Sequence, residues 1–509
     1  MLRIYVYFRK KEINKNMNDN ISELFEKFLL IESHSTLFQL AINNIRIWQY
    51  IRYSFADKLL QEISGVDYIR DNGGYLNHPK KQKGIQEFFR RQQFLLKRKD
   101  LLVINHPRRV KRGKYYECYV TETLLKNINN SYYVFESPYK GNHIGPAKTK
   151  NLKYRDITVL ERVFDINKTI NRSEVSNATK YIIETFERGF DIKLSNRFKS
   201  QISSIVSSTY HTVFYSMIYA KIILFLIRPK TILLTVYYDV MNQALIEAAK
   251  KKNIPVIELQ HGRIGKTHIA YNYPENVQVD TFPDYLFVYG EYEKNIPRYP
   301  IPKQNIYAVG YPDLEERANY YKKKKKKNSK KIVTFMSSPI DGHIVADMAI
   351  KLQELNKDII VVYKLHPSEY SCWKKNYPNL IKSGIKIVET NEHDIYYYLG
   401  HSDVIVGISS TALYEALMFN TKIVVLKYQE YDKCEPLYKN GCAALVSSVE
   451  EINDIISVKE NTTNNKVSNF YFEMNAINKM KKALNECKGK KKNDISSSPF
   501  FSKSTFKYR

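Results

Sequence analysis

The chain has 509 residues, 43% of them hydrophobic, and 80 basic against 52 acidic residues give it a formal net charge of +28. This length predicts two or three domains, and the apolar content excludes a chain that is disordered throughout. The excess positive charge favours anionic partners such as nucleotide phosphates or phospholipid headgroups. No nucleic-acid-binding motif accompanies the charge, so we expect no nucleic-acid partner.

Residues 1–100 are predicted to be mostly helical, from the apolar spacing in "LFQLAINNIRIWQYIRYSFADKLL". The opening "MLRIYVYFRKKEINK" lacks an apolar region of signal-peptide length, and the five cysteines form no C-x-x-C pair and fit no zinc pattern. Both observations indicate a protein of the reducing cytoplasm.

Residues 101–311 are predicted to form a Rossmann-like domain. It begins with "KDLLVINHPRRVKRGKYYECYVTETLL", which predicts a strand, a basic loop and a helix. In the apolar stretch "TVFYSMIYAKIILFLIRP", Lys221, Arg228 and Pro229 limit the run to less than the roughly 20 residues of a spanning helix. We expect a buried helix there, or alternatively an interfacial helix that touches a membrane.

From residue 229 strands and helices alternate. "PKTILLTVYYD" and "IPVIELQ" are predicted strands joined by the helix "VMNQALIEAAKKKN", and "DYLFVYG" and "NIYAVGYP" continue the series. The lysine-rich residues 312–331 are a candidate linker. Residues 332–450 repeat the alternation and predict a second Rossmann-like domain; 451–487 are predicted closing helices and 488–509 a disordered tail. The expected fold class is α/β, with two doubly wound domains that face a cleft and a helical N-terminal extension.

Ligands of open α/β sheets bind outside the carboxyl ends of the strands, which selects His261 after the strand "IPVIELQ". An imidazole can accept a proton near neutral pH, and Gly262 permits a sharp turn or a close backbone approach. We predict His261 as catalytic, with Gln260, Gly262 and Arg263 lining the cleft; a histidine that only bonds its own loop is the alternative. "GKT" is not a P-loop, because Gln260 occupies the position five before Gly265 and "HIAYNYPEN" is a poor helix.

A second set of strand-end residues is predicted to bind the donor. Ser409, Ser410 and Thr411 end a strand and open a helix, where backbone N–H groups and hydroxyls suit a phosphate or simply cap the helix. Glu415, about one turn on, could accept hydrogen bonds from ribose or sugar hydroxyls or be merely exposed.

The other predicted donor-binding residues end two further strands. His366 ends "IIVVYKLHP", and Pro367 restricts it to an extended conformation that aims the imidazole, with Lys364 nearby, across the sheet edge. Ser337 and Ser338 follow the first strand of the second domain. No D-x-D and no H-E-x-x-H occurs, so we expect neither a metal nor another cofactor, the nucleotide-sugar being a substrate.

The motifs "LQHG", "GYP", "KLHP" and "GISSTALYEAL", in that order, resemble bacterial GT-B glycosyltransferases of the capsule and surface polysaccharide type. These are related to CDP-glycerol glycerophosphotransferases and to polysialyltransferases. The resemblance covers residues 229–450, and the first 200 residues share it only loosely. It implies that His261 is the general base on the acceptor hydroxyl and that His366 and residues 409–411 hold the donor phosphate, with Glu415 on the ribose or sugar. It also implies that residues 101–311 form the acceptor-side domain and residues 332–450 the nucleotide-donor-binding domain.

We therefore expect a cytoplasmic, metal-independent glycosyltransferase, peripheral on the inner face of the cell membrane. It would move a sugar from a nucleotide-activated donor to a growing, lipid-linked bacterial surface polysaccharide. The alternatives are a CDP-activated polyol-phosphate transferase of teichoic-acid-like polymer synthesis, and a non-catalytic basic scaffold or nucleic-acid-binding protein.

Overall fold

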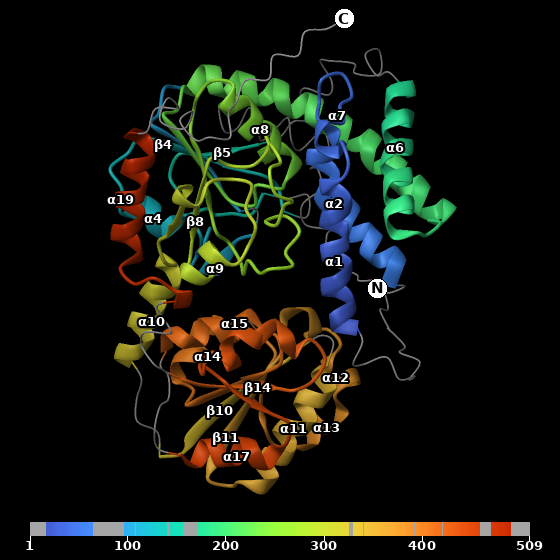
Figure 1. Ribbon diagram of the computed structural model, residues 1–509. Coiled ribbons are helices and arrows are strands. Elements are labelled where there is room, and N and C mark those ends of the chain that lie inside the picture. Colours follow the sequence, from blue (N-terminus) through green and yellow to red (C-terminus); the bar gives the residue numbers. More distant parts are fainter. Residues whose placement is uncertain are drawn as a thin grey trace, which may run out of the picture. The chain divides into compact units, whose positions relative to one another are not determined.

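The computed structural model describes residues 17–64, 96–106, 108–139, 143–155, 172–324, 329–338, 341–390, 392–419, 421–458 and 470–489. The chain divides into two compact units (Figure 1). The N-terminal unit comprises Leu29–Glu315 and Asn469–Arg509, and the C-terminal unit comprises Glu316–Ser468 and Met1–Phe28. The predicted tail at 488–509 lies outside the described residues from residue 490 onward.

A seven-stranded parallel sheet forms the centre of the N-terminal unit. In sheet order its strands are β5 (Leu152–Tyr154), β4 (Tyr132–Glu136), β1 (Leu101–Ile104), β6 (Thr231–Leu234), β7 (Val256–Leu259), β8 (Tyr285–Val288) and β9 (Ile306–Ala308). Every residue of β1, β6, β7 and β8 is buried, as expected of strands covered on both faces.

The strand order reverses between β1 and β6. From β1 the chain adds β4 and β5 on one side, and then β6 to β9 on the other. The crevice outside the carboxyl ends of such strands is where open α/β sheets bind ligands. The residues that follow β1 and β6 therefore mark the predicted site in this unit.

Long helices accompany this sheet. α7 (Asn196–Ile227) packs on α2 (Ile47–Ser64), α6 (Arg172–Phe190) and α8 (Val240–Lys250) (Figure 1). The apolar stretch predicted to be too short for a span thus lies in a 32-residue helix that continues through Lys221. Within the described residues, α7 passes the test of length and composition for a membrane-crossing helix, and 44% of its most apolar window is buried in the protein.

Smaller elements complete the N-terminal unit. The predicted basic loop after β1 is a hairpin of β2 (Val110–Arg112) and β3 (Tyr115–Glu117), closed by an antiparallel pair of short strands. The remaining helices are α1 (Met17–Ser33), which spans the division between the units, η1 (Leu37–Gln39), α4 (Glu122–Lys126), α9 (Glu291–Asn295) and η5 (Lys303–Asn305).

The C-terminal unit contains a six-stranded parallel sheet. In sheet order its strands are β12 (Lys386–Val388), β11 (Ile359–Lys364), β10 (Lys331–Met336), β13 (Val404–Gly407), β14 (Lys422–Leu426) and β15 (Ala444–Val446). The order reverses between β10 and β13, so the predicted donor residues after these strands flank a second crevice position.

Shorter helices alternate with these strands along the chain. They are α10 (Pro312–Lys324), α11 (Gly342–Leu355), η6 (Pro367–Glu369), α12 (Trp373–Asn376), α13 (Pro378–Lys382), α14 (Ile395–His401), α15 (Thr411–Glu415), η7 (Ala416–Phe419), η8 (Tyr431–Cys434), α16 (Glu435–Lys439) and α17 (Val449–Ser457). The predicted linker at 312–331 is therefore helical over its first part, and the division between the units at Glu315 and Glu316 falls inside α10.

The end of the described chain returns to the N-terminal unit. In α19 (Ala476–Gly489), Met480, Leu484 and Cys487 are buried in one core with β1, β7 and β8. Gly310 makes this return possible: it has a φ of +86°, and a Cβ there would collide with the carbonyl oxygen of Glu473. The predicted closing helices thus belong to different units, α17 to the C-terminal one and α19 to the N-terminal one.

The predicted class, α/β with two Rossmann-like doubly wound domains, is confirmed by the two parallel sheets and their strand orders. The cleft between the two domains stays a prediction.

Candidate functional site

Three aromatic side chains meet at the order reversal of the N-terminal sheet. His106 follows β1, Tyr238 follows β6 and His261 follows β7. The ring centroids of the two histidines lie 5.4 Å apart, and the Tyr238 hydroxyl lies 3.3 Å from Nε2 of His261. The side chain of His261 is 14% exposed, which leaves the ring within reach of a substrate hydroxyl.

A carboxyl group lies behind His261. Glu258 belongs to β7, is 1% exposed, and places Oε1 3.9 Å from Nδ1 of His261. Its Oε1 accepts hydrogen bonds from the backbone N–H of Tyr237 at 3.1 Å and the hydroxyl of Tyr271 at 2.8 Å. Oε2 of Glu258 and Nδ1 of His261 have no hydrogen-bond partner among the described residues. The carboxyl group therefore lies near the imidazole without a hydrogen bond to it, unlike the hydrogen-bonded pairs that orient catalytic histidines.

Burial moves the pKa values of this pair in opposite directions. Desolvation raises the pKa of Glu258 to about 8, and the hydrogen bonds from Tyr237 and Tyr271 only partly offset it. Desolvation, reinforced by electrostatic interactions with His268 and Arg108, lowers the pKa of His261 to about 3. His261 is therefore uncharged at neutral pH and has a lone pair to accept a proton.

Gln260, Gly262 and Arg263, predicted to line the cleft beside His261, differ in burial and contacts. Gln260, predicted to line the cleft, is instead buried: its amide accepts from the Tyr289 N–H at 2.6 Å and donates to the Gly262 carbonyl at 2.8 Å, which fixes the loop. A Cβ on Gly262 would meet nothing within 4 Å, so no close chain contact requires glycine there. Arg263 is half-buried.

The residues "GKT" do not bind phosphate in the manner of a P-loop. The N–H of His268 donates to the carbonyl of Gly265 at 3.1 Å, so Lys266 lies in a turn. The next helix, α9, begins only at Glu291. The exclusion of a P-loop is confirmed by this geometry.

In the C-terminal unit, the end of β13 presents the predicted hydroxyl cluster. Ser410 caps α15 by accepting from the N–H of Ala412 at 3.3 Å, so the capping role holds whether or not a phosphate binds. Ser409 is half-buried, Thr411 is exposed, and Glu415 is half-buried at the last residue of α15.

Two of the predicted donor residues face the protein interior. The Ser337 hydroxyl bonds the Tyr363 hydroxyl at 2.9 Å and a Glu369 carboxylate oxygen at 3.0 Å. Nζ of Lys364 donates to the Leu365 carbonyl and to the Tyr370 hydroxyl. Desolvation lowers the pKa of Lys364 to about 8. The polar groups of Ser337 and Lys364 are thus hydrogen-bonded within the protein and stabilise the loops at the predicted donor position.

His366 and Ser338 are the outer residues of this group. His366 is exposed and caps η6: its Nδ1 lies 2.7 Å from the Ser368 hydroxyl, and its own N–H donates to Glu369 Oε2 at 2.8 Å. These bonds fix the ring at the carboxyl end of β11. Ser338 is half-buried after β10, next to β11 in the sheet. The structure thus groups His366, Ser338 and residues 409–411 along one sheet edge.

Sequence reasoning missed three residues of the N-terminal site. His106 stands in "INHP", the same strand-His-Pro pattern as "YKLHP", and that repetition was the available signal. Glu258 is a lone acid in the apolar strand "VIEL", and Tyr238 has no distinctive pattern around it. The part of the chain that the structure describes contains no group of three or more His, Cys, Asp or Glu that could hold a metal ion.

The chain matches no family model and no curated protein. Among solved structures it is similar to the UDP-GlcNAc 2-epimerase from Neisseria meningitidis bound to UDP-GlcNAc, with 14% identity, a TM-score of 0.47, and coverage of 76% of this chain and 99% of that one. The UDP-GlcNAc 2-epimerase from Methanocaldococcus jannaschii has 12% sequence identity to this chain and a TM-score of 0.45, and the match covers 76% of this chain and 99% of that one. The wall teichoic acid polymerase TagF has 10% sequence identity and a TM-score of 0.41, and the match covers 86% of this chain and 98% of that one.

Proposed function

We propose that this chain is a glycosyltransferase that moves a sugar from a nucleotide-activated donor to a hydroxyl of a growing, lipid-linked bacterial surface polysaccharide. The observation that carries the proposal is the uncharged, partly exposed His261 at the order reversal of the N-terminal sheet, with Glu258 behind it. An acceptor hydroxyl that approaches the ring would lose its proton to Nε2 as its oxygen attacks the anomeric carbon of the donor.

The donor half of the reaction belongs to the C-terminal unit. His366 and the backbone N–H groups and hydroxyls at Ser409–Thr411 would neutralise the departing nucleotide phosphate, with Glu415 on the ribose or sugar. Ser337 and Lys364 would act through the loops that they hold. We propose that no metal or other cofactor takes part.

A screen of UDP-, CDP-, CMP- and GDP-activated sugars tests the proposal through thermal protection of the chain and release of the free nucleotide. We expect at least one donor to raise the Tm and to be hydrolysed slowly without an acceptor. Mass analysis of the product separates the alternatives: a polyol-phosphate transferase adds phosphorus to the acceptor, whereas a glycosyltransferase does not. If no activated sugar protects or is cleaved, the enzyme proposal fails and a non-catalytic role takes its place.

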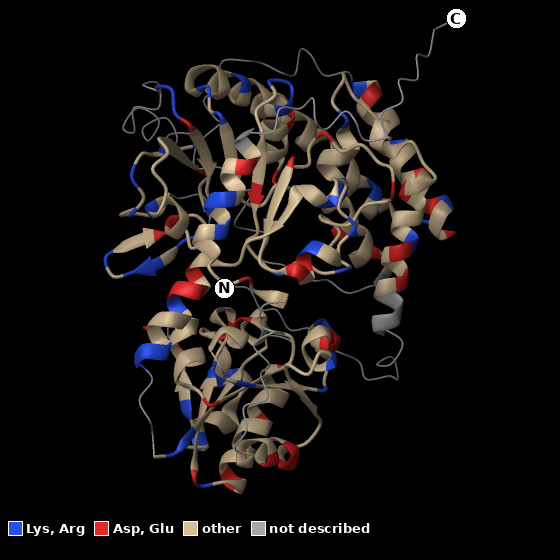
Figure 2. Cartoon of the chain, turned by 60° about the vertical axis from the view of Figure 1, so that its left-hand side comes forward, with Lys and Arg blue, Asp and Glu red and all other residues tan. Residues whose placement is uncertain are grey.

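We also propose a cytoplasmic location with peripheral attachment to the inner membrane face. On α7, Ile222, Phe225 and Leu226 are exposed large apolar residues that share one face, and Phe225 is 61% exposed. Lys221, Arg228 and Lys230 are exposed beside them. An apolar strip with basic neighbours suits the boundary of an anionic bilayer. Elsewhere Lys and Arg are interspersed with Asp and Glu (Figure 2), which favours a localised contact over a nucleic-acid-binding face.

A further inference from the structure

A small cavity lies beside the His261 cluster, outside the carboxyl ends of four neighbouring strands. Asn105 follows β1, Ser137 follows β4, Arg155 follows β5 and Val236 follows β6, and all four line it. Its remaining wall is the start of α8, capped by Asp239. The cavity has room for a group about the size of one water molecule, which needs two or more polar partners to be stable there.

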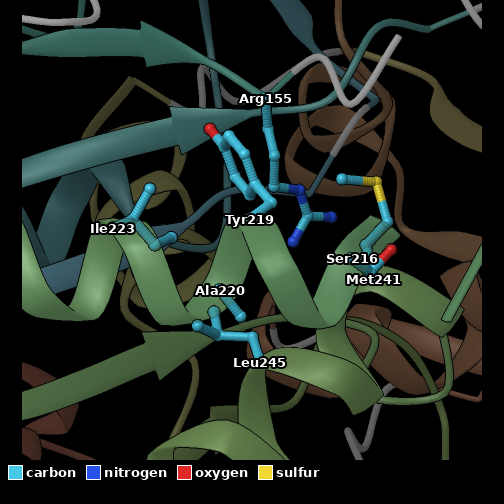
Figure 3. A pocket seen from close by; sticks show the side chains of 7 residues that line it. All are labelled: Arg155, Ser216, Tyr219, Ala220, Ile223, Met241 and Leu245. Carbon is cyan, nitrogen blue, oxygen red and sulfur yellow. The ribbon is translucent and has the colours of Figure 1, made fainter. Parts of the chain in front are cut away.

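Arg155 forms the floor of this cavity. Its guanidinium donates to the Ser137 hydroxyl at 3.0 Å, to Asn242 Oδ1 at 2.5 Å and to Asp239 Oδ1 at 3.2 Å. On its other side Arg155 borders a second small pocket, where the guanidinium lies between Tyr219 of α7 and Met241 of α8 (Figure 3). The arginine is thus held rigidly from several elements.

The backbone at the rim is strained. Val236 has a φ of +55°, a conformation that β-branched residues rarely adopt. The amide of Asn242 holds it by donating to the carbonyls of Thr235 at 3.0 Å and Val236 at 2.9 Å. Strain of this kind persists where surrounding bonds enforce it and is concentrated at ligand sites.

One buried polar atom in the wall of the cavity makes no hydrogen bond with the described residues. Asn105 is 3% exposed and its Oδ1 accepts from the Thr121 hydroxyl at 2.5 Å, whereas its Nδ2 has no partner among the described residues. A buried amide donor left this way destabilises the fold unless a ligand or water satisfies it. The Asp239 carboxylate, whose side chain is 24% exposed, also lines the cavity and can accept a hydrogen bond.

Charge decides which ligand fits. Among the lining residues the positive charge of Arg155 is matched by the negative charge of Asp239, so the cavity has no net charge with which to attract an anion. An anion would also lie against the Asp239 carboxylate. A hydroxyl can accept from one side and donate to the other, as these two residues require.

We propose that this cavity is a subsite for one hydroxyl of a neutral sugar or polyol, which accepts a hydrogen bond from Asn105 Nδ2 and donates one to Asp239. The inference rests on the proposed function and specifies its acceptor: Asn105 precedes His106 and Asp239 follows Tyr238, so the bound hydroxyl would be a neighbour of the one that reacts at His261.

The test measures binding of three probes to the full chain by saturation-transfer NMR: methyl α-D-glucopyranoside, glycerol and glycerol 3-phosphate. Two variants change the hydrogen-bonding atoms and keep the shape. Asp239→Asn retains the helix cap, and Asn105→Asp retains the oxygen that accepts from Thr121. Asp191→Asn, at an exposed position with a φ of +56°, is the matched control. Circular dichroism confirms that each variant is folded.

We expect the neutral probes to bind the wild type and the control alike and to bind both cavity variants about tenfold more weakly. Glycerol 3-phosphate should bind no more tightly than glycerol. The subsite is overturned if no neutral probe binds, if both variants bind as the wild type does, or if Asp239→Asn tightens glycerol 3-phosphate binding, which would make it an anion site. Nucleotide-sugar hydrolysis is measured in the same preparations. Its absence counts against glycosyl transfer, whereas retained hydrolysis without probe binding counts against the subsite alone.

Discussion

Glu258 holds its proton up to about pH 8 and His261 is uncharged above about pH 3, since burial raises the pKa of the first and lowers that of the second. In the proposed mechanism, ionised Glu258 would attract Nδ1–H of His261 from 3.9 Å away and leave the lone pair of Nε2 for the acceptor. We therefore expect kcat to rise with pH through about 8. Glu258→Gln should lower kcat by on the order of 10²-fold or more and remove that rise, because an amide donor to Nδ1 fixes the wrong tautomer.

A second buried acid provides the control for this profile. Desolvation also raises the pKa of Glu293 to about 8, but no ion pair or ring contact joins it to His261 in the described residues. Glu293→Gln should keep the rise near pH 8. A profile that Glu258→Gln leaves unchanged would show that Glu258 does not position the base.

The same carboxyl affects stability. Glu258 keeps its proton up to about pH 8 when folded and releases it near pH 4.3 when unfolded, so unfolding releases a proton between these values. Its contribution to the free energy of unfolding is present below that window and is lost as pH rises, by at most about 1.4 kcal/mol per pH unit. Between pH 6 and pH 8, urea unfolding should show a smaller fall in the free energy of unfolding for Glu258→Gln than for the wild type. An equal fall in both proteins would contradict the raised pKa of Glu258.

His261 itself gives the direct test of catalysis. His261→Ala should lower kcat by about 10²–10⁴-fold while the donor protects the chain as before, because the donor residues lie in the other unit. Turnover and Tm with donor are measured on one preparation. Unchanged turnover would rule out a base at this position.

At the scale of the elements, α7 tests the membrane proposal. Phe225→Ser removes the most exposed ring of the apolar strip and should lower sedimentation with vesicles of anionic phospholipid by roughly tenfold, a loss of about 1.4 kcal/mol of partitioning. Leu355→Ser, at an exposed leucine that ends α11 in the other unit, is the matched control. Equal vesicle binding by both variants and the wild type would assign the strip another role.

The elements also show what sequence alone can supply. Continuous apolar runs predicted β6 to β9 and β10 to β14, since a strand buried on both faces needs no alternation. The hairpin β2–β3 was not predicted, because its strands VKR and YYE contain no continuous apolar run, and the short strand β15 was not predicted either. Strand-end position predicted His261 and His366 as site residues. It could not show that Ser337 and Lys364 point inward, because Tyr363, Glu369 and Tyr370 decide that through bonds formed only in the fold.

For the whole molecule, the proposed chemistry needs no divalent ion. Excess EDTA, added before the donor, should leave the rate of nucleotide release within about twofold of the untreated rate, since in the proposed mechanism backbone N–H groups and imidazole would take the place of a metal at the leaving phosphate. A loss of activity that Mg²⁺ or Mn²⁺ restores would refute this. Any metal bound would then have to be held by the substrate phosphates together with few protein ligands.

The return of α19 to the N-terminal unit also orders events during synthesis. The core around β1, β7 and β8 includes Met480, Leu484 and Cys487, so it is incomplete until these residues have left the ribosome. Residues 329–458 contain the whole six-stranded sheet and can collapse earlier. A released chain that ends at residue 468 would therefore contain a complete C-terminal unit and an N-terminal unit that still exposes apolar surface to chaperones.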